Sequence, residues 1–87
     1  GTVSNNNENP EVSTQTGEKK STFITLYGPK NSEKALVQVN VNGSNVYSKT
    51  LTKGSSDVVK IKGSTNTVEV EIFHDGVSQG KNMVRLH

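Results

Sequence analysis

The sequence predicts a small antiparallel β-sandwich of about six strands, preceded by a polar linker. Three observations carry this prediction. Apolar residues alternate with polar residues in short runs, which is typical of strands with one buried and one exposed face. Turn dipeptides such as Asn-Gly, Asp-Gly and Gly-Pro separate these runs at spacings close to ten residues. No stretch combines a helical period with a cap and a stop signal.

The first part of the 87-residue chain differs in composition from the rest. Residues 1–21 are rich in Asn, Glu, Ser and Thr and contain only two apolar side chains, Val3 and Val12. Such a segment cannot bury enough apolar surface to offset the entropy that it loses on ordering. We therefore expect a disordered linker over 1–21 and the folded domain over 22–87. The alternative is a first strand through Val12, which has no apolar partner at a period of two.

Six runs within the domain have the composition of strands, which favour Val, Ile, Thr and aromatic residues. The first run is closed by Gly28-Pro29, and two others lead into the hairpin dipeptides Asn42-Gly43 and Asp75-Gly76. Two sheets of such strands, packed face to face, form a sandwich. The expected strands are 22–27, 35–41, 46–51, 57–62, 67–73 and 81–86.

The hairpin at Asn42-Gly43 can pair in two registers, and a slip of one residue moves every side chain to the other face. If the dipeptide is the centre of a type I′ turn, Val39 lies opposite Val46, which joins the buried valines and leaves Tyr47 outside. A three-residue loop over 43–45 instead places Tyr47 on the valine face. The Asn-Gly dipeptide favours the I′ turn, which we prefer, whereas the matching of apolar residues favours the loop.

Residue types that support catalysis are sparse. Nucleophilic catalysis needs a nucleophile, a base within reach and a group that orients the base. His74 stands beside Asp75 at a turn, and Glu69 and Glu71 project from one face of a strand; solvated positions explain all four. The chain has no cysteine and no His or carboxylate cluster with metal-ligand spacing. Phosphate-binding glycine motifs are also absent. We expect no enzyme activity, no metal and no cofactor.

Charge and aromatic content limit the classes of partner. The chain carries ten Lys or Arg and eight Asp or Glu, a net charge of +2, without the clustered basic footprint of a nucleic-acid binder. No apolar run is long enough to span a membrane, and the fragment is expected to be monomeric. Phe23 and Phe73 are expected in the core. The candidate contact surface consists of Gln38, Tyr47, Lys49, Lys53, Lys60 and Lys62.

The motifs ITLYGPKNSEKALVQVNVNG, NVYSKTL and DVVKIKGSTNTVEVEIFHDG follow one another in residues 24–76. Their order resembles the immunoglobulin-like domain that follows the PASTA repeats in membrane serine/threonine kinases of Gram-positive bacteria. The resemblance implies an immunoglobulin-like sandwich on the extracellular face of a membrane-anchored protein. It also implies a non-catalytic spacer or a module that binds the cell wall or a partner. The kinase lobe is not in this chain, so kinase activity is not expected.

The stretch VYSKTLTKG after the Asn-Gly turn is similar to a second family, the extracellular β-domain of RodZ-type cell-shape proteins. That family usually has a Trp in the strand before the turn, where this chain has Leu36 and Val37. The second resemblance implies an envelope scaffold that acts by protein–protein pairing. An exposed edge strand is a ready template for such pairing. The runs 22–27 and 81–86 are the candidate edges.

Overall fold

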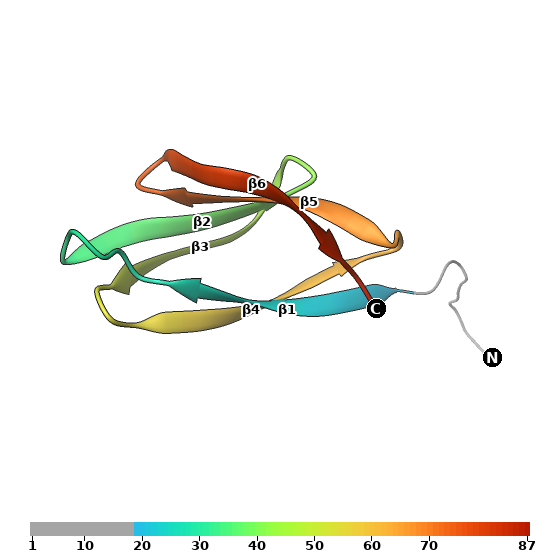
Figure 1. The fold of residues 1–87 in the computed structure, drawn as a ribbon, viewed down its shortest axis with the longest axis horizontal. Helices are drawn as coiled ribbons and strands as arrows, with labels where there is room; N and C mark the ends of the chain where they lie inside the picture. Colours follow the sequence, from blue (N-terminus) through green and yellow to red (C-terminus); the bar gives the residue numbers. More distant parts are fainter. Residues whose placement is uncertain (1–18) are drawn as a thin grey trace.

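The computed structural model describes residues 19–87 and shows an all-β domain of antiparallel strands in two layers (Figure 1). One layer is the pair β1–β4, and the other is a four-stranded sheet in the order β3-β2-β5-β6. The strands are β1 (Lys20–Tyr27), β2 (Lys34–Val41), β3 (Ser44–Thr52), β4 (Ser56–Gly63), β5 (Thr67–His74) and β6 (Val77–Arg85). The predicted six-stranded β-sandwich is confirmed. Residues 1–18, which make up most of the predicted linker, lie outside the described residues.

Five of the six strands begin earlier than the sequence predicts, β1 by two residues and β6 by four. β1 starts at Lys20 because Ser21 is held on both sides: it lies opposite Lys62 of β4 and exchanges two backbone hydrogen bonds with His87. These two bonds have N···O distances of 3.2 and 3.0 Å. β6 starts at Val77 because the two-residue turn after His74 connects β5 directly to β6. The predicted boundary of the domain therefore moves from residue 22 to residue 20.

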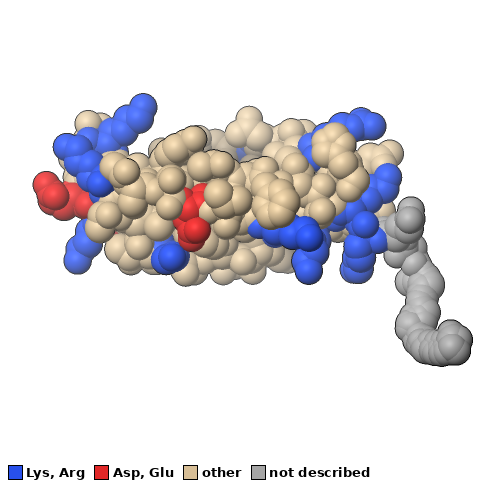
Figure 2. Space-filling model, turned by 90° about the horizontal axis from the view of Figure 1, so that it is seen from below, with Lys and Arg blue, Asp and Glu red and all other residues tan. Residues whose placement is uncertain are grey.

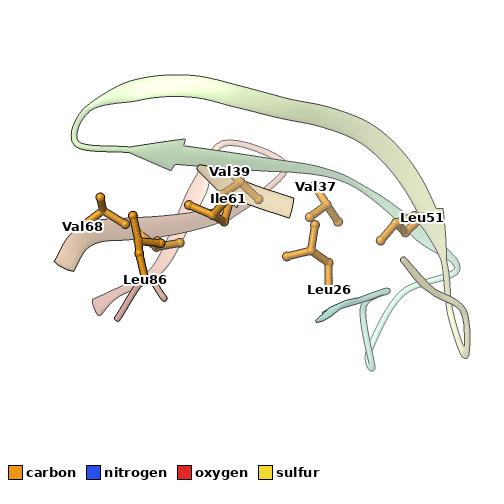
Figure 3. Packing of buried hydrophobic residues seen from close by; sticks show 8 residues of the cluster. Leu26, Val37, Val39, Leu51, Ile61, Val68 and Leu86 are labelled. Atoms are coloured by element: carbon orange, nitrogen blue, oxygen red, sulfur yellow. The ribbon is translucent and has the colours of Figure 1, made fainter. Parts of the chain in front are cut away.

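The core lies between the two layers and is made of aliphatic side chains from both. Leu26 and Ile61 come from the β1–β4 pair, and Val37 and Val39 come from β2; all four are at most 2% exposed. In Figure 3 the side chains of Leu26 and Val37 point toward each other across the gap between the layers. Each fully buried side chain of this size stabilises the fold by about 1.5–3 kcal/mol, so a core this small depends on every member.

Both hairpin turns in the four-stranded sheet are of type I′, as the dipeptides predict. Asn42 and Gly43 have φ angles of 50° and 84°, and Asp75 and Gly76 have φ angles of 50° and 81°. Type I′ turns need positive φ at both central residues, and Asn, Asp and Gly reach this region most readily. The Asn-Gly and Asp-Gly pairs are therefore explained by backbone geometry.

The first residue of each turn also extends the ladder between β2 and β5. The backbone N–H of Asn42 donates to the Glu69 carbonyl at 2.8 Å, and its side-chain Oδ1 accepts from the Glu69 N–H at 2.9 Å. Asp75 makes the same pair of bonds with Leu36, both at 2.8 Å. Each hairpin turn thus caps a strand of the other hairpin.

The register of the first hairpin differs from the prediction beyond its turn. A β-bulge at Val46 shifts the pairing, so that Val39 lies opposite Tyr47 and Ala35 lies opposite Leu51. Val46 is 52% exposed, whereas Leu51 is buried and Tyr47 packs against the core. The I′ turn was predicted correctly, but the prediction that Val46 is buried and Tyr47 exposed is wrong. One extra residue in β3 reverses the face of everything that follows.

The prediction of two core phenylalanines is also wrong. Phe23 is 66% exposed because Ile24 and Leu26 occupy the inward positions of β1, and alternation turns Phe23 outward. Phe73 lies opposite Gln38 on the outer face of the four-stranded sheet and is half-buried. The core is therefore purely aliphatic, with the aromatic ring of Tyr47 at its margin.

Candidate functional site

The six predicted contact residues do not form one surface. Gln38 lies on the outer face of the four-stranded sheet, between the buried Val37 and Val39. Lys53 lies in the turn between β3 and β4. Lys60 and Lys62 share the outer face of β4, because both alternate with the buried Ile61 and therefore point away from the core. The other two residues, on β3, lie where the two layers meet.

Tyr47 and Lys49 join the two layers through a carboxylate. The hydroxyl of Tyr47 donates to Oδ2 of Asp57 on β4 at 2.8 Å, and the Lys49 ammonium lies 3.5 Å from the same oxygen. Burial, with the bond to Asp57 and its negative charge, raises the pKa of Tyr47 to about 12. The Tyr47 hydroxyl, followed by the Val58 N–H and Lys49, lowers the pKa of Asp57 below its ordinary value. These contacts are structural, because they hold β3 of one layer against β4 of the other.

The outer face of the β1–β4 pair carries large apolar side chains that are exposed to solvent. Phe23 and Tyr27 are each 66% exposed, and Val58 is 57% exposed. Register places Phe23 opposite Lys60 and Val58 opposite Thr25, so these side chains share one face. The Lys60 ammonium lies 5.8 Å from the centre of the Phe23 ring, within the range of a cation–π contact. We call Phe23, Tyr27, Val58, Lys60 and Lys62 the outer patch.

Carboxylates are missing from the outer patch. Asp57 is the acidic residue of β1 and β4, and it points inward to Tyr47. Figure 2 shows this side of the molecule, with Lys and Arg atoms toward both ends, mostly uncharged atoms between them, and Asp or Glu atoms at the left end and left of centre. Residues 19–87 carry all ten Lys and Arg of the chain against five Asp and Glu, a formal charge of +5. The outer patch therefore combines exposed apolar rings with positive charge.

Most carboxylates elsewhere in the described region are engaged with neighbours. Glu69 lies 3.5 Å from the Lys81 ammonium, and Glu71 accepts a hydrogen bond from the Ser78 hydroxyl at 2.7 Å. Asp75 accepts the N–H of Leu36. These contacts hold the strands in register, and they leave the lysines of the outer patch without a carboxylate partner among residues 19–87.

An open cleft of about 560 Å³ lies between the layers, beside β1. Leu26, Ala35, Val37 and Ile72 form its apolar floor, with His74 and Gln79 among the polar groups around it. His74 is half-buried opposite Val37, with no nucleophile bonded to it in the described region. No group of three or more His, Asp or Glu side chains within residues 19–87 is arranged to hold a metal ion.

Comparison with family models, with curated proteins and with solved structures finds no match for the chain. Among residues 19–87 no helix is long and apolar enough to cross a bilayer. The candidate site therefore rests on the geometry of the domain. The sequence analysis found Lys60 and Lys62 but missed Phe23, Tyr27 and Val58. The signal was present in the run TFITLY, Thr22 to Tyr27, in which both faces carry large apolar side chains.

Proposed function

We propose that this domain is a non-catalytic binding module on the extracellular side of a bacterial cell-envelope protein. In this proposal the outer patch binds an anionic cell-wall polymer. The observation that carries it is that exposed Phe23, Tyr27 and Val58 share the outer face of the β1–β4 pair with Lys60 and Lys62, and that neither strand turns a carboxylate onto this face. The resemblance to the domain after PASTA repeats supports a membrane-anchored kinase of a Gram-positive bacterium as the parent protein.

The outer patch suits a polymer with charged and apolar parts in alternation. Phe23 and Tyr27 are four residues apart on one strand, which separates their rings by roughly 13 Å along the strand. Such rings pack against the C–H groups of a polyol or sugar chain, while ammonium groups beside them attract its phosphates. Because the lysines are exposed, salt screens this attraction, and binding is expected to weaken as ionic strength rises.

Calorimetric titration with poly(glycerol phosphate) teichoic acid tests the proposal. A lysine near an anionic surface contributes on the order of 1 kcal/mol. We expect the variant K60Q/K62Q to bind the polymer roughly 30-fold more weakly than the unchanged protein. The matched control K34Q/R85Q removes the same charge from exposed positions in the four-stranded sheet and should bind normally. Equal losses in the two variants would show that net charge, and not the outer patch, controls binding.

A second candidate function is that of an envelope scaffold that pairs with another protein, as the resemblance to RodZ-type domains implies. The observation that favours it is that β1 and β6 are edge strands of their sheets. The same titration separates the two candidates. A scaffold of this kind binds teichoic acid no better than it binds the neutral polymer dextran.

A further inference from the structure

One edge of β1 presents unpaired backbone groups. Ser21 exchanges both of its backbone hydrogen bonds with His87, so the N–H and C=O of Ser21 point away from β4. The N–H of Gly28 donates to Ser55 at 2.9 Å, on the β4 side. Because these groups alternate along an antiparallel strand, those of Phe23, Thr25 and Tyr27 point to the free edge. None of these groups has a hydrogen-bond partner among residues 19–87.

The free edge of β1 runs beside the open cleft. The bond between Tyr47 and Asp57 holds β4 against β3, so the next position in the β1–β4 layer, beyond β1, faces β5 and β6. There the cleft is lined by Leu26 of β1, by Ile72 and His74 of β5, and by Gln79 of β6. Leu26 and Val37, whose side chains face each other in Figure 3, both line this cleft. A third strand, added to the β1–β4 layer beside β1, would cover the cleft.

The other edges are less suited to strand addition. Bulges interrupt β3 at Val46 and β6 near Gly80, and bulges disrupt the regular ladder that an added strand needs. The free edge of β4 faces β3, and the side chains of Tyr47 and Lys49 fill the space between these two strands. The N–H of Val58 on that edge already donates to Asp57 Oδ1 at 2.9 Å. β1 pairs with β4 without a register shift over its whole length.

We infer that the free edge of β1 binds an extended segment of a partner protein as a third strand of the β1–β4 sheet. Alternate apolar side chains of this segment enter the cleft, and acidic residues flank them. The acidic flanks follow from Lys30, which lines the cleft, from Lys19 and Lys20 at the start of β1, and from the +5 charge of residues 19–87.

A second copy of the chain fits this edge less well than a separate peptide. In a β1–β1 pair the inward side chains, Ile24 and Leu26, are already packed in their own cores and leave the cleft unfilled. Two copies would also bring like net charges together. The inference does not depend on polymer binding, because the outer patch and the free edge are different surfaces.

Amide hydrogen exchange of the whole chain, followed by NMR, tests the inference. The probe is an acetylated and amidated heptapeptide of alternating valine and threonine with a glutamate at each end. We expect the peptide to slow exchange at Phe23, Thr25 and Tyr27 by about tenfold or more. Ile24 and Leu26, whose N–H groups face β4, should change little. Unchanged exchange at all three edge residues with millimolar peptide would overturn the inference, as would protection confined to β6.

Variants of the edge and of the cleft separate this site from the outer patch. T25P removes an N–H that points to the free edge, and we expect peptide binding to weaken at least about tenfold, whereas T25A keeps the N–H and binds normally. Q79W fills the cleft from an exposed position and should also weaken peptide binding, so a failure of T25P to fold leaves the test intact. K60Q/K62Q keeps Lys19, Lys20 and Lys30 and should weaken peptide binding far less than T25P does. Normal peptide binding by both T25P and Q79W would contradict the inference.

Discussion

The hairpins β2–β3 and β5–β6 are built alike but lie in different environments. Each has a type I′ turn whose first residue caps a strand of the other hairpin, and each has a bulge in its second strand. After its bulge β3 places Tyr47 and Leu51 toward the core. The corresponding part of β6 contains Gly80 and is exposed from Val77 to Met83.

The difference shows which features depend on local sequence and which depend on the second layer. Turn dipeptides determine where each hairpin reverses, and they do so in the same way in both. β1 and β4 decide what is buried, because they cover the inner faces of β2 and β5 and the side chains of Tyr47 and Leu51 on β3, and leave the turn end of β6 open. The β1–β4 pair therefore serves as cover on its inner face and as a candidate binding surface on its outer face.

The largest expected effect compares the second strands of the two hairpins. L51A creates a cavity beneath the covering layer and should lower the free energy of unfolding by about 3 kcal/mol. M83A, in the uncovered β6 where Met83 is 67% exposed, should change it by less than about 0.5 kcal/mol. Urea unfolding followed by circular dichroism measures both. Similar losses in the two variants would mean that β6 is covered in solution.

A smaller effect is expected at the turns, where the hairpins are alike. N42A and D75A each force alanine to a φ near 50° and remove the oxygen that accepts a strand N–H. Each variant should lose about 2 kcal/mol of stability in the same urea experiment. N42G and D75G relieve the backbone strain and should lose roughly half as much. A large loss at one turn with none at the other would contradict the reciprocal capping.

The smallest effect concerns the contact that fastens β3 under the second layer. Y47F removes the hydrogen bond to Asp57 and should cost about 1 kcal/mol near neutral pH, whereas Y27F, on the outer face, should cost nothing measurable. Thermal unfolding across pH measures this difference.

The contact between Tyr47 and Asp57 makes the stability of the protein depend on pH in both the alkaline and the acid range. Because the pKa of Tyr47 is raised, Tyr47 contributes to the free energy of unfolding below pH 10.0, and this contribution is lost as the pH rises toward about 12. The lowered pKa of Asp57 means that its contribution is present above 3.8 and lost as the pH falls below that value. Y47F should flatten the alkaline limb and weaken the acid limb. If Y47F loses stability at alkaline pH as steeply as the unchanged protein does, groups other than Tyr47 cause that loss.

Much of the fold could be predicted from the sequence because its signals are local. Alternation and turn dipeptides gave the six strands and both I′ turns, including Asn42-Gly43 and Asp75-Gly76. The bulge at Val46 was not predicted, although the matching of apolar residues favoured Tyr47 on the valine face. Asn45 stabilises the bulge locally, because its side-chain Nδ2 donates to the carbonyls of Val39 and Tyr47 at 3.4 and 3.1 Å. Long-range contacts stabilise the shifted register as well, because it lets Tyr47 reach Asp57 and buries Leu51 against the β1–β4 layer.

Less of the candidate site could be predicted. Lys60 and Lys62 were identified because alternation on β4 turns them outward. Phe23 was assigned to the core on its hydrophobicity alone, although Ile24 and Leu26 beside it compete for the inward positions of β1. Which of two apolar sets in one strand is buried depends on the opposing sheet, and the sequence does not show how the sheets are arranged.

The most direct test of the central claim is to map amide chemical shifts of the unchanged protein during titration with poly(glycerol phosphate). The outer patch predicts shifts on β1 and β4, centred on Phe23, Val58 and Lys60, that diminish as salt is added. Shifts centred on β6 would contradict the account, and so would unchanged spectra at millimolar phosphate.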